Sequence, residues 1–315
     1  MDHNTPKPYA REGLRGGGRL EYVSIGRILV GTCNWADHGH FYPLGLPAAE
    51  RLMYYARFFP IVEVDTTFYG IPKPAVAERW VETTPEAFRL NVKAYRSLTL
   101  HDREEGQPRQ PTAAEERGFL EMLQPLRQAG KLAGVHYQFP PWFKASPANM
   151  DFVARLPERH PEDQLIVEFR HESWAEPARF DAVTELLSEA GMTYCVVDEP
   201  QVGSASMPPH VVVTNPRLAV VRFHGQNRQK WYVKNARSST ERFDYLYPEA
   251  SLHEWVPRVK SLATEADQVH VLFNNNRSNY AVANGLQMAQ MLELGLPPPE
   301  TVPAVIEPQQ ERLPL

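Results

Sequence analysis

Residues 165–174 join an apolar run to a carboxylate, a guanidinium and an imidazole, a combination that could do chemistry at the end of a strand. Residues 165–167 are apolar and lead into Glu168, Arg170 and His171 without an intervening turn residue. Side chains alternate between the faces of a strand, so Glu168 and Arg170 share one face and His171 lies on the other. Burying such groups is costly unless they pair with each other or bind a ligand.

Seven further apolar segments follow the same strand-like pattern, and six of them also end in polar or ionisable residues. The eight segments span residues 28–33, 61–66, 88–93, 132–138, 165–170, 193–198, 218–224 and 269–274. The residues that could do chemistry at or just after their ends are Glu63, Asp65, Tyr69, Lys93, Gln138, Glu168, Arg170, His171, Trp174, Asp198, Arg222, His224, Asn274, Asn275 and Arg277. The ends of parallel barrel strands share one mouth, where we expect these residues to converge.

Four cations in this set predict a site for an anion such as phosphate or carboxylate. Lys93, Arg170 and Arg222 come from three different strand ends. Arg277 follows a fourth and precedes a predicted helix, whose N-terminal amides add positive potential. Guanidinium and ammonium groups form strong charge-assisted hydrogen bonds with such anions. We therefore expect a small anionic ligand, including phosphorylated compounds.

The carboxylates and one histidine of the set predict acid/base catalysis. Glu63 and Glu168 are the expected proton carriers, with His224 as a second candidate. A lysine among other cations has a depressed pKa, so Lys93 could also act as a base or nucleophile. We predict these four residues as catalytic and the other eleven of the set as substrate-binding.

A purely structural interpretation of the same charges stays open. Polar layers inside a barrel can pair with each other, so Glu63, Lys93, Glu168 and Arg222 could form a buried ion network without catalysis. The number of unlike groups at the strand ends exceeds what packing requires, which favours a functional site.

Helical patterns between the eight apolar segments predict the fold. They cover residues 47–59, 74–81, 111–129, 150–156, 180–190, 252–263 and 278–294, whereas residues 199–215 are rich in Pro, Gly and Ser and show no clear helix. Alternating strands and helices indicate parallel pairing, and eight such units predict an α/β (β/α)8 TIM barrel. An open doubly wound sheet is the alternative, and the absence of GxGxxG after a strand weakens its dinucleotide-binding form.

Composition limits the domain organisation and the partners. We predict a flexible N-terminal tail at residues 1–27, the barrel at 28–297 and a Pro-rich C-terminal tail at 298–315. The net charge of −5 argues against a chain-wide field for nucleic acid. No run of 18 apolar residues and no apolar signal core occur, so we expect neither membrane association nor secretion. Two cysteines without a CxxC spacing favour a cytoplasmic protein with reduced thiols.

The histidines give no tight metal-binding signature. His38 and His40 have the spacing of an HxH motif, but they lie on a glycine-containing loop, where we do not expect a metal site. His136 and His270 lie nearer the middles or starts of strands, where we predict packing histidines. HExxH, Cys/His clusters, P-loops and GxSxG are absent, so we predict no metal ligand and leave the cofactor unknown.

Seven motifs, in order, carry a family resemblance. They begin at residues 30–32 with the 41–43 loop, then 63–72, 91–94, 138–141, 167–174, 222–225, and 273–275 with 280–282. The sequence resembles the domain of unknown function 72, or YecE-like, family, which implies a TIM barrel but no established activity. Asp65, Tyr95, Glu172 and Asn276 depart from the motifs usual in that family.

Two other functions remain open at this stage. One is a metal-dependent phosphodiesterase or nuclease of the endonuclease IV type, which the shortage of histidines at strand ends disfavours. The other is a nucleic-acid-binding barrel that uses the N-terminal tail and the loop at Arg228, Lys230, Trp231 and Tyr232. Basic residues interleaved with aromatic ones suit single-stranded nucleic acid.

Overall fold

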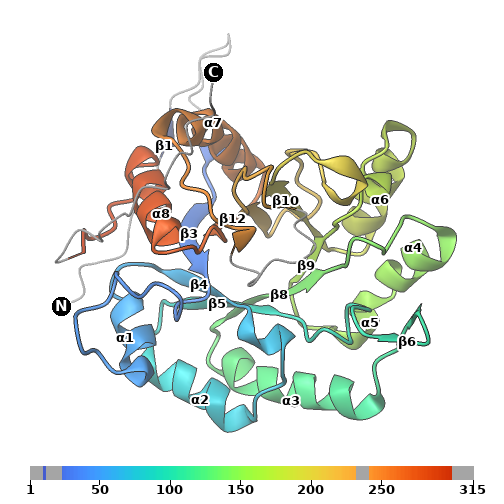
Figure 1. The fold of residues 1–315 in the computed structure, drawn as a ribbon, viewed down its shortest axis with the longest axis horizontal. Coiled ribbons are helices and arrows are strands. Elements are labelled where there is room, and N and C mark those ends of the chain that lie inside the picture. Colours follow the sequence, from blue (N-terminus) through green and yellow to red (C-terminus); the bar gives the residue numbers. More distant parts are fainter. Residues whose placement is uncertain (1–9, 12–22, 232–240, 300–315) are drawn as a thin grey trace.

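A closed barrel of eight parallel strands forms the centre of the molecule. The computed structural model describes residues 10–11, 23–231 and 241–299. The strands follow the order β3, β4, β5, β8, β9, β10, β11 and β12 around the barrel, and β12 closes against β3 (Figure 1). Their bounds are Arg27–Cys33, Ile61–Val64, Arg89–Lys93, Leu132–Gln138, Leu165–Glu168, Thr193–Asp198, Ala219–Phe223 and Gln268–Phe273. The (β/α)8 fold predicted from the sequence is therefore confirmed.

Helices surround the strands on the outside (Figure 1). Their bounds, α1 to α8, are Arg51–Tyr55, Pro74–Thr83, Ala113–Gln128, Pro147–Ala154, Leu156–Arg159, Pro177–Glu189, Glu249–Glu265 and Tyr280–Met291. Single 3-10 turns occur at Ala48–Glu50, Thr66–Phe68, Glu172–Trp174 and Gly203–Ala205. In the described part of the chain, the connection from β10 to β11 holds only the last of these turns, as the Pro/Gly/Ser-rich sequence predicted.

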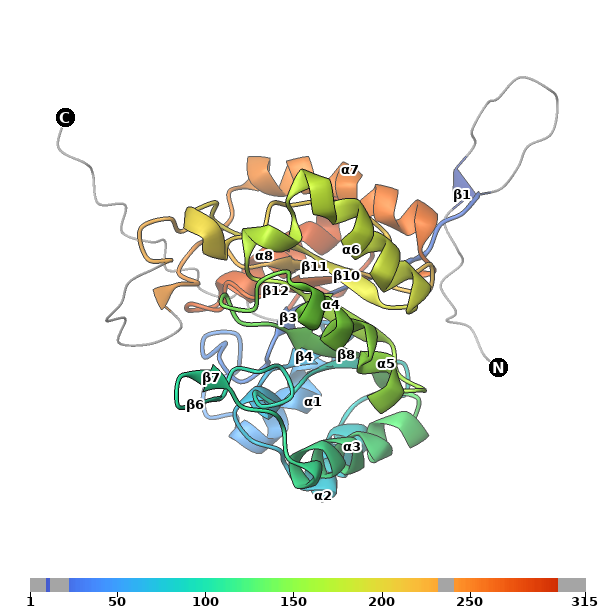
Figure 2. The same ribbon diagram turned by 90° about the vertical axis from the view of Figure 1, so that its right-hand side faces the viewer.

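Two short antiparallel pairs lie outside the barrel. β6 (Arg103–Glu104) pairs with β7 (Gln107–Pro108) in the connection after β5, and Figure 2 shows this hairpin at the left. β1 (Ala10–Arg11) pairs with β2 (Val23–Ser24) within the segment predicted to be a flexible tail. The rest of that segment up to residue 22, and residues 300–315, lie outside the described residues.

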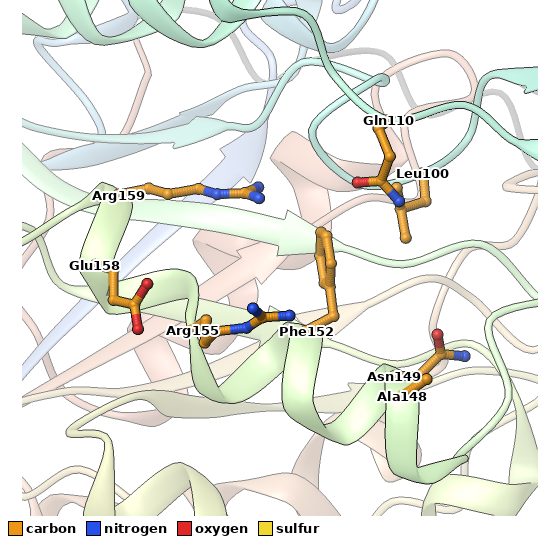
Figure 3. A pocket seen from close by; sticks show the side chains of 8 residues that line it. All are labelled: Leu100, Gln110, Ala148, Asn149, Phe152, Arg155, Glu158 and Arg159. Atoms are coloured by element: carbon orange, nitrogen blue, oxygen red, sulfur yellow. The ribbon is translucent and has the colours of Figure 1, made fainter.

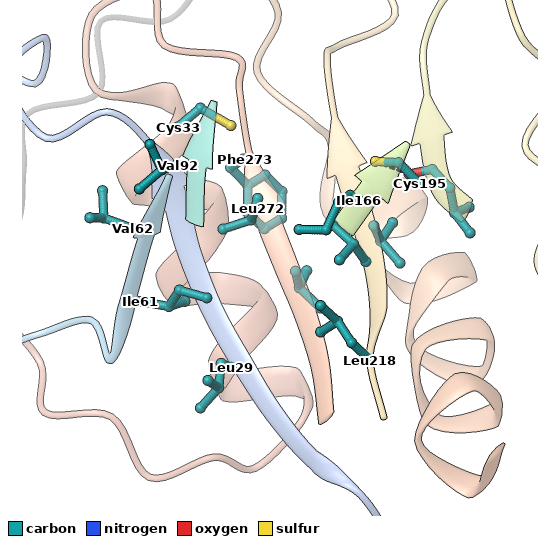
Figure 4. Packing of buried hydrophobic residues seen from close by; sticks show 14 of the residues in the cluster. Leu29, Cys33, Ile61, Val62, Val92, Ile166, Cys195, Leu218, Leu272 and Phe273 are labelled. Atoms are coloured by element: carbon teal, nitrogen blue, oxygen red, sulfur yellow. Dashed lines mark hydrogen bonds between the residues drawn. The ribbon is translucent and has the colours of Figure 1, made fainter. Parts of the chain in front are cut away.

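Apolar side chains fill the barrel and the layer under the helices. Figure 4 shows Leu29, Ile61, Ile166 and Leu272, which come from four different strands and are all buried. Gly134 of β8 leaves room for Ile166, because a Cβ there would lie 2.6 Å from Cδ1 of Ile166 and that side chain would have to shift. The strand ends, by contrast, bury charged side chains.

We expect Gly134→Ala to lower the free energy of unfolding by about 1–3 kcal/mol, because overpacking forces neighbours off their rotamers. Ile166→Val removes the clashing Cδ1, so the double variant should lose less than the sum of the two single variants. Urea unfolding of all three measures this coupling. Gly39→Ala is the control, because a Cβ at Gly39 meets open space; strictly additive losses would contradict the clash.

Candidate functional site

A guanidinium between two carboxylates lies at the centre of the barrel. Arg222 of β11 donates from Nη2 to Oε1 of Glu63 (2.6 Å) and from Nη1 to Oε2 of Glu168 (2.5 Å). Arg222 and Glu63 are 1% exposed and Glu168 is fully buried, so water cannot compensate these charges. The three side chains come from β11, β4 and β9, and their pairing ties together strands that are not neighbours.

Two buried histidines complete this layer. His136 of β8 lies with Nδ1 3.1 Å from Oε2 of Glu63 and Nε2 3.2 Å from Oε2 of Glu168. It is thus a polar link between the carboxylates rather than the packing histidine that its mid-strand position predicted. His224 places Nε2 3.2 Å from Oε1 of Glu168. We call Glu63, His136, Glu168, Arg222 and His224 the buried layer.

The buried layer keeps its carboxylates ionised. Burial raises the pKa of Glu63 and Glu168, but Arg222 together with the adjacent histidines outweighs burial and holds both pKa values well below their usual range. Burial lowers the pKa of His224 to about 3, although Glu168 opposes the shift. At neutral pH the glutamates therefore accept hydrogen bonds, and His224 is neutral.

A pocket of about 740 Å³ opens directly above this layer at the carboxyl end of the strands. Six of the fifteen residues predicted from the sequence line it, together with loop residues that the sequence did not single out. The lining residues are Asn34, Asp37, Asp65, Thr66, Phe68, Tyr69, Lys93, His101, Gln138, Pro141, Trp142, Arg170, Ala205, Trp231, Arg242, Phe243, Asn274 and Asn276.

Arg170 presents a fixed positive charge to the pocket. Its Nη1 lies 3.1 Å from Oε1 of Glu168 and 3.3 Å from Oε2 of Glu199, and its guanidinium stacks 5.1 Å from the ring centre of Trp231. Burial lowers the pKa of Arg170, but Glu199 and Glu168 raise it further, so the net shift is upward. Arg170 therefore stays charged and oriented before any ligand arrives.

Lys93 enters the same pocket from the end of β5. Its Nζ donates to Oε1 of Gln138 (3.1 Å) and lies 4.8 Å from the ring centre of Phe68. Burial and then the nearby charge of Arg222 lower the pKa of Lys93. Lys93 therefore loses its proton at a lower pH than a surface lysine does.

Asp65 is the pocket carboxyl group best suited to exchange protons near neutral pH. Burial raises its pKa to about 6, although Lys93 opposes the shift. Asp65 lies two residues after Glu63, just beyond the end of β4. It is half-buried and reachable from the pocket, whereas Glu63 is sealed below.

His101, Phe68 and Phe243 line the pocket but were not among the residues predicted from the sequence, because they lie on loops. Nδ1 of His101 lies 2.8 Å from the hydroxyl of Thr99, and its ring contacts Phe68 and Trp142 edge-on. Burial lowers its pKa to about 3, with Lys93 contributing. A histidine that is neutral at working pH can donate or accept a hydrogen bond without adding charge.

Two predicted binding residues on the loop after β9 do not line the pocket. His171 is buried with Nδ1 2.9 Å from the hydroxyl of Ser173. Trp174 stacks on Phe169 with ring centres 4.0 Å apart. Both hold the loop in place, so direct substrate contact by them receives no support from the geometry.

Three further predicted binding residues also lie away from the pocket lining. Asp198 accepts hydrogen bonds from the hydroxyl of Tyr247 (2.6 Å) and from Nε1 of Trp255 (2.7 Å), which anchors β10 to α7. Asn275 is buried, and its amide donates to a backbone carbonyl. Arg277 is exposed on the β12–α8 loop. Asn274 does line the pocket, and its Nδ2 lies 2.9 Å from Nδ1 of His224.

One cluster in the described part of the chain could offer three ligands to a metal ion. His136, Glu168 and Cys195 place ligand atoms within 4.8 Å of one another. The carboxylate of Glu168 is already bound by Arg222, whose positive charge would oppose a cation there. The cluster also lies below the pocket, so it fits a metal poorly.

A second pocket lies on the outer surface beside α4 and α5. It measures about 380 Å³ and is formed on one side by Phe152, Arg155 and Arg159, with Leu100 and Gln110 facing them (Figure 3). The guanidinium of Arg159 stacks 5.2 Å from the ring centre of Phe152. This pocket shares no lining residue with the one at the mouth.

Comparisons with known proteins agree with the barrel and its motifs. The family model described as "Protein of unknown function DUF72" matches residues 29–307. The chain belongs to this family. The UPF0759 protein YunF of Bacillus subtilis is 34% identical over 272 residues, covering 85% of this chain and 95% of that protein. The UPF0759 protein YecE of Escherichia coli K12 is 28% identical, covering 79% and 93%.

Solved structures from the DUF72 family share the fold. A DUF72 family protein from Enterococcus faecalis superposes with a TM-score of 0.78 at 29% identity, covering 87% of this chain and all of that chain. One from Thermotoga maritima gives 0.73 at 32% identity, covering 85% and 99%. These names carry no activity. Of the helices the structure describes, none combines the length and apolarity that a membrane span requires.

We expect Arg222→Met to lower the free energy of unfolding by about 3–5 kcal/mol, because it leaves two buried carboxylates without their partner. Urea denaturation followed by circular dichroism measures the change. The control is Arg155→Met, which breaks a 2.7 Å pair with Asp151 that is about 60% exposed on each side. Equal losses in both variants would show that the buried layer is not held by Arg222.

Proposed function

We propose that this protein is an enzyme that acts on a small anionic substrate, including phosphorylated compounds, by acid/base chemistry at the barrel mouth. The observation that carries the proposal is a single pocket whose lining includes the cations Lys93, Arg170 and Arg242 and a carboxyl group, Asp65, whose pKa burial raises to about 6. Perturbed ionisable groups in a concave site are typical of catalytic centres.

Arg170 is the proposed anchor for the anion. Two buried carboxylates and the indole of Trp231 fix its guanidinium, so little conformational entropy is lost when a ligand binds. Gln138 and Asn274 line the same pocket and supply neutral hydrogen-bonding groups for orientation.

Asp65 is the proposed proton carrier. This assignment moves acid/base work away from Glu63, Glu168 and His224, the residues expected from the sequence. The pKa values of the two glutamates lie far below neutrality, and neither side chain lines the pocket. In this proposal they are positioning residues: they hold Arg222, and Glu168 also orients Arg170.

No specific observation favours the two alternatives. A metal-dependent nuclease would need Glu168, which Arg222 already binds. A single-stranded nucleic-acid platform would need an open Trp231, which is 2% exposed, while Lys230 pairs with Asp244 at 2.8 Å. Tyr232 and residues 1–9 and 12–22, also part of that alternative, lie outside the described residues. The proposed compartment is the cytoplasm, since both cysteines are free thiols.

Incubation with a cell extract tests for turnover. We expect the wild-type protein to deplete an anionic metabolite, followed by untargeted mass spectrometry, and Asp65→Asn to slow that depletion about 100-fold or more, as loss of a general acid or base does. Glu82→Gln on α2, away from the pocket, is the control and should retain full activity. Unchanged activity in Asp65→Asn would contradict the assigned role.

Anion affinity should fall as the pH rises through about 6, the value to which burial raises the pKa of Asp65. Below that value Asp65 is neutral, and above it the carboxylate repels the anion. Sulfate is a suitable probe because its charge is constant across this range, and calorimetry measures its affinity. Asp65→Asn should remove this step, although a step from Glu199, whose pKa burial raises to about 7, would remain.

Arg170→Met should weaken sulfate binding about tenfold or more at every pH, since a charged hydrogen bond contributes roughly 1.5–3 kcal/mol. Arg79→Met, on the exposed face of α2, is the matched control. Equal affinities in the two variants would place the anion elsewhere.

A further inference from the structure

The contacts of Lys93 differ from those of a lysine that serves only as a positive charge. Its nearest polar partner is the neutral amide oxygen of Gln138 at 3.1 Å, and the face of Phe68 covers it at 4.8 Å. A primary amine remains a hydrogen-bond donor to Gln138 after it loses its proton. The surroundings of Lys93 therefore tolerate the uncharged form.

We infer that Lys93 is a nucleophile that forms a Schiff base with a small carbonyl compound bearing an anionic group. The inference rests on the proposed function, because it uses the same pocket and the same anion anchor, and it names the substrate class. Lysines become nucleophilic when they are desolvated or placed beside another cationic group. Lys93 meets both conditions, since it is enclosed in the barrel mouth above Arg222.

The groups that a Schiff base requires share one pocket with Lys93. Arg170 would bind the anionic end of the substrate, and Asp65 lies close enough to Lys93 for each to shift the pKa of the other. Burial and the charge of Arg222 lower the pKa of Lys93, which increases the fraction of free amine. Glu63 and Glu168 oppose this shift from below, but Arg222 already neutralises part of their charge.

The proposed step conserves atoms and charge. The lone pair of the Nζ amine attacks the carbonyl carbon, the C–N bond forms as the C=O π bond breaks, and the carbonyl oxygen takes a proton from protonated Asp65 to give a carbinolamine. Asp65 takes a proton from the nitrogen and delivers it to the hydroxyl group, which leaves as water. The product is a protonated imine between Lys93 and the substrate, formed from amine, carbonyl and one proton with release of one water. No oxidant or metal is required.

Borohydride trapping tests this step with the full-length protein. The probes are pyruvate, a carbonyl carboxylate, and dihydroxyacetone phosphate, a carbonyl phosphate; the two arms distinguish the anionic groups. Reduction converts an imine into a stable secondary amine that intact-mass measurement detects and peptide mapping locates. We expect one adduct at Lys93 with at least one probe. Lactate, which has no carbonyl group to form an imine, should give no adduct.

Two lysine variants separate this role from a structural one. Lys93→Arg keeps the positive charge but cannot form an imine, so labelling should fall about tenfold or more. Lys131→Arg is the matched control, because Lys131 is also buried but bonds backbone carbonyls between β8 and α2, away from the pocket; its labelling should equal wild type. Melting temperatures of both variants establish that they fold.

The outcomes distinguish the two proposals. Sulfate binding that depends on Arg170, with no adduct from either probe, overturns the Schiff base and leaves the anion site standing. If the protein shows no sulfate binding and no adduct, both proposals are overturned. An adduct that persists in Lys93→Arg assigns the label to another amine and overturns the inference. An adduct lost only in Lys93→Arg supports it.

Discussion

The pairing of Arg222 with Glu63 and Glu168 is the constraint on which the mouth of this barrel depends. Three strands end in charges that cannot reach water, and Arg222 lies between the two carboxylates and pairs with both. A buried ion pair adds little net stability over an apolar core, because desolvation offsets most of the attraction. Its effect is geometric: the hydrogen bonds hold the ends of β4, β9 and β11 at fixed distances and so define the floor of the pocket.

Glu168 connects the buried layer to the pocket. One carboxylate bonds Arg222 in the buried layer and Arg170 in the pocket, and it also lies within 3.2 Å of His136 and His224. Glu168, which was predicted to be catalytic from its sequence position, thus has four polar neighbours. In the proposed function the acid/base group is one that faces the pocket and lies outside this layer, which Asp65 satisfies.

Strand periodicity predicted which side chains face inward but not how deep they lie. Each inward residue has a partner two positions later on the same face, about 7 Å further along the strand. Glu63 and Asp65 form such a pair, as do Glu168 and Arg170, and in both cases the first is sealed and the second lines the pocket. The sequence contains this spacing, but the depth at which water enters depends on the loops that cover the mouth.

Those loops account for the parts of the site that could not be predicted. His101, Trp142 and Phe243 follow strands at irregular distances and reach the pocket through turns without a hydrophobic period. Loop geometry also explains His171 and Trp174, which were predicted to bind substrate. The loop after β9 places both side chains in packing contacts instead of in the pocket lining. The eight strands and most helices were predictable because periodic burial determines them.

The separation into two layers also determines which protons can move. Because Arg222 and the adjacent histidines keep Glu63 and Glu168 ionised, Asp65 and Glu199 are the carboxyl groups suited to exchange protons near neutral pH, with pKa values raised by burial to about 6 and about 7. An anion bound to Arg170 would add negative charge beside both carboxyl groups and raise these values further. Ligand binding and proton uptake are then linked, so the same event that positions a substrate also protonates an acid beside it.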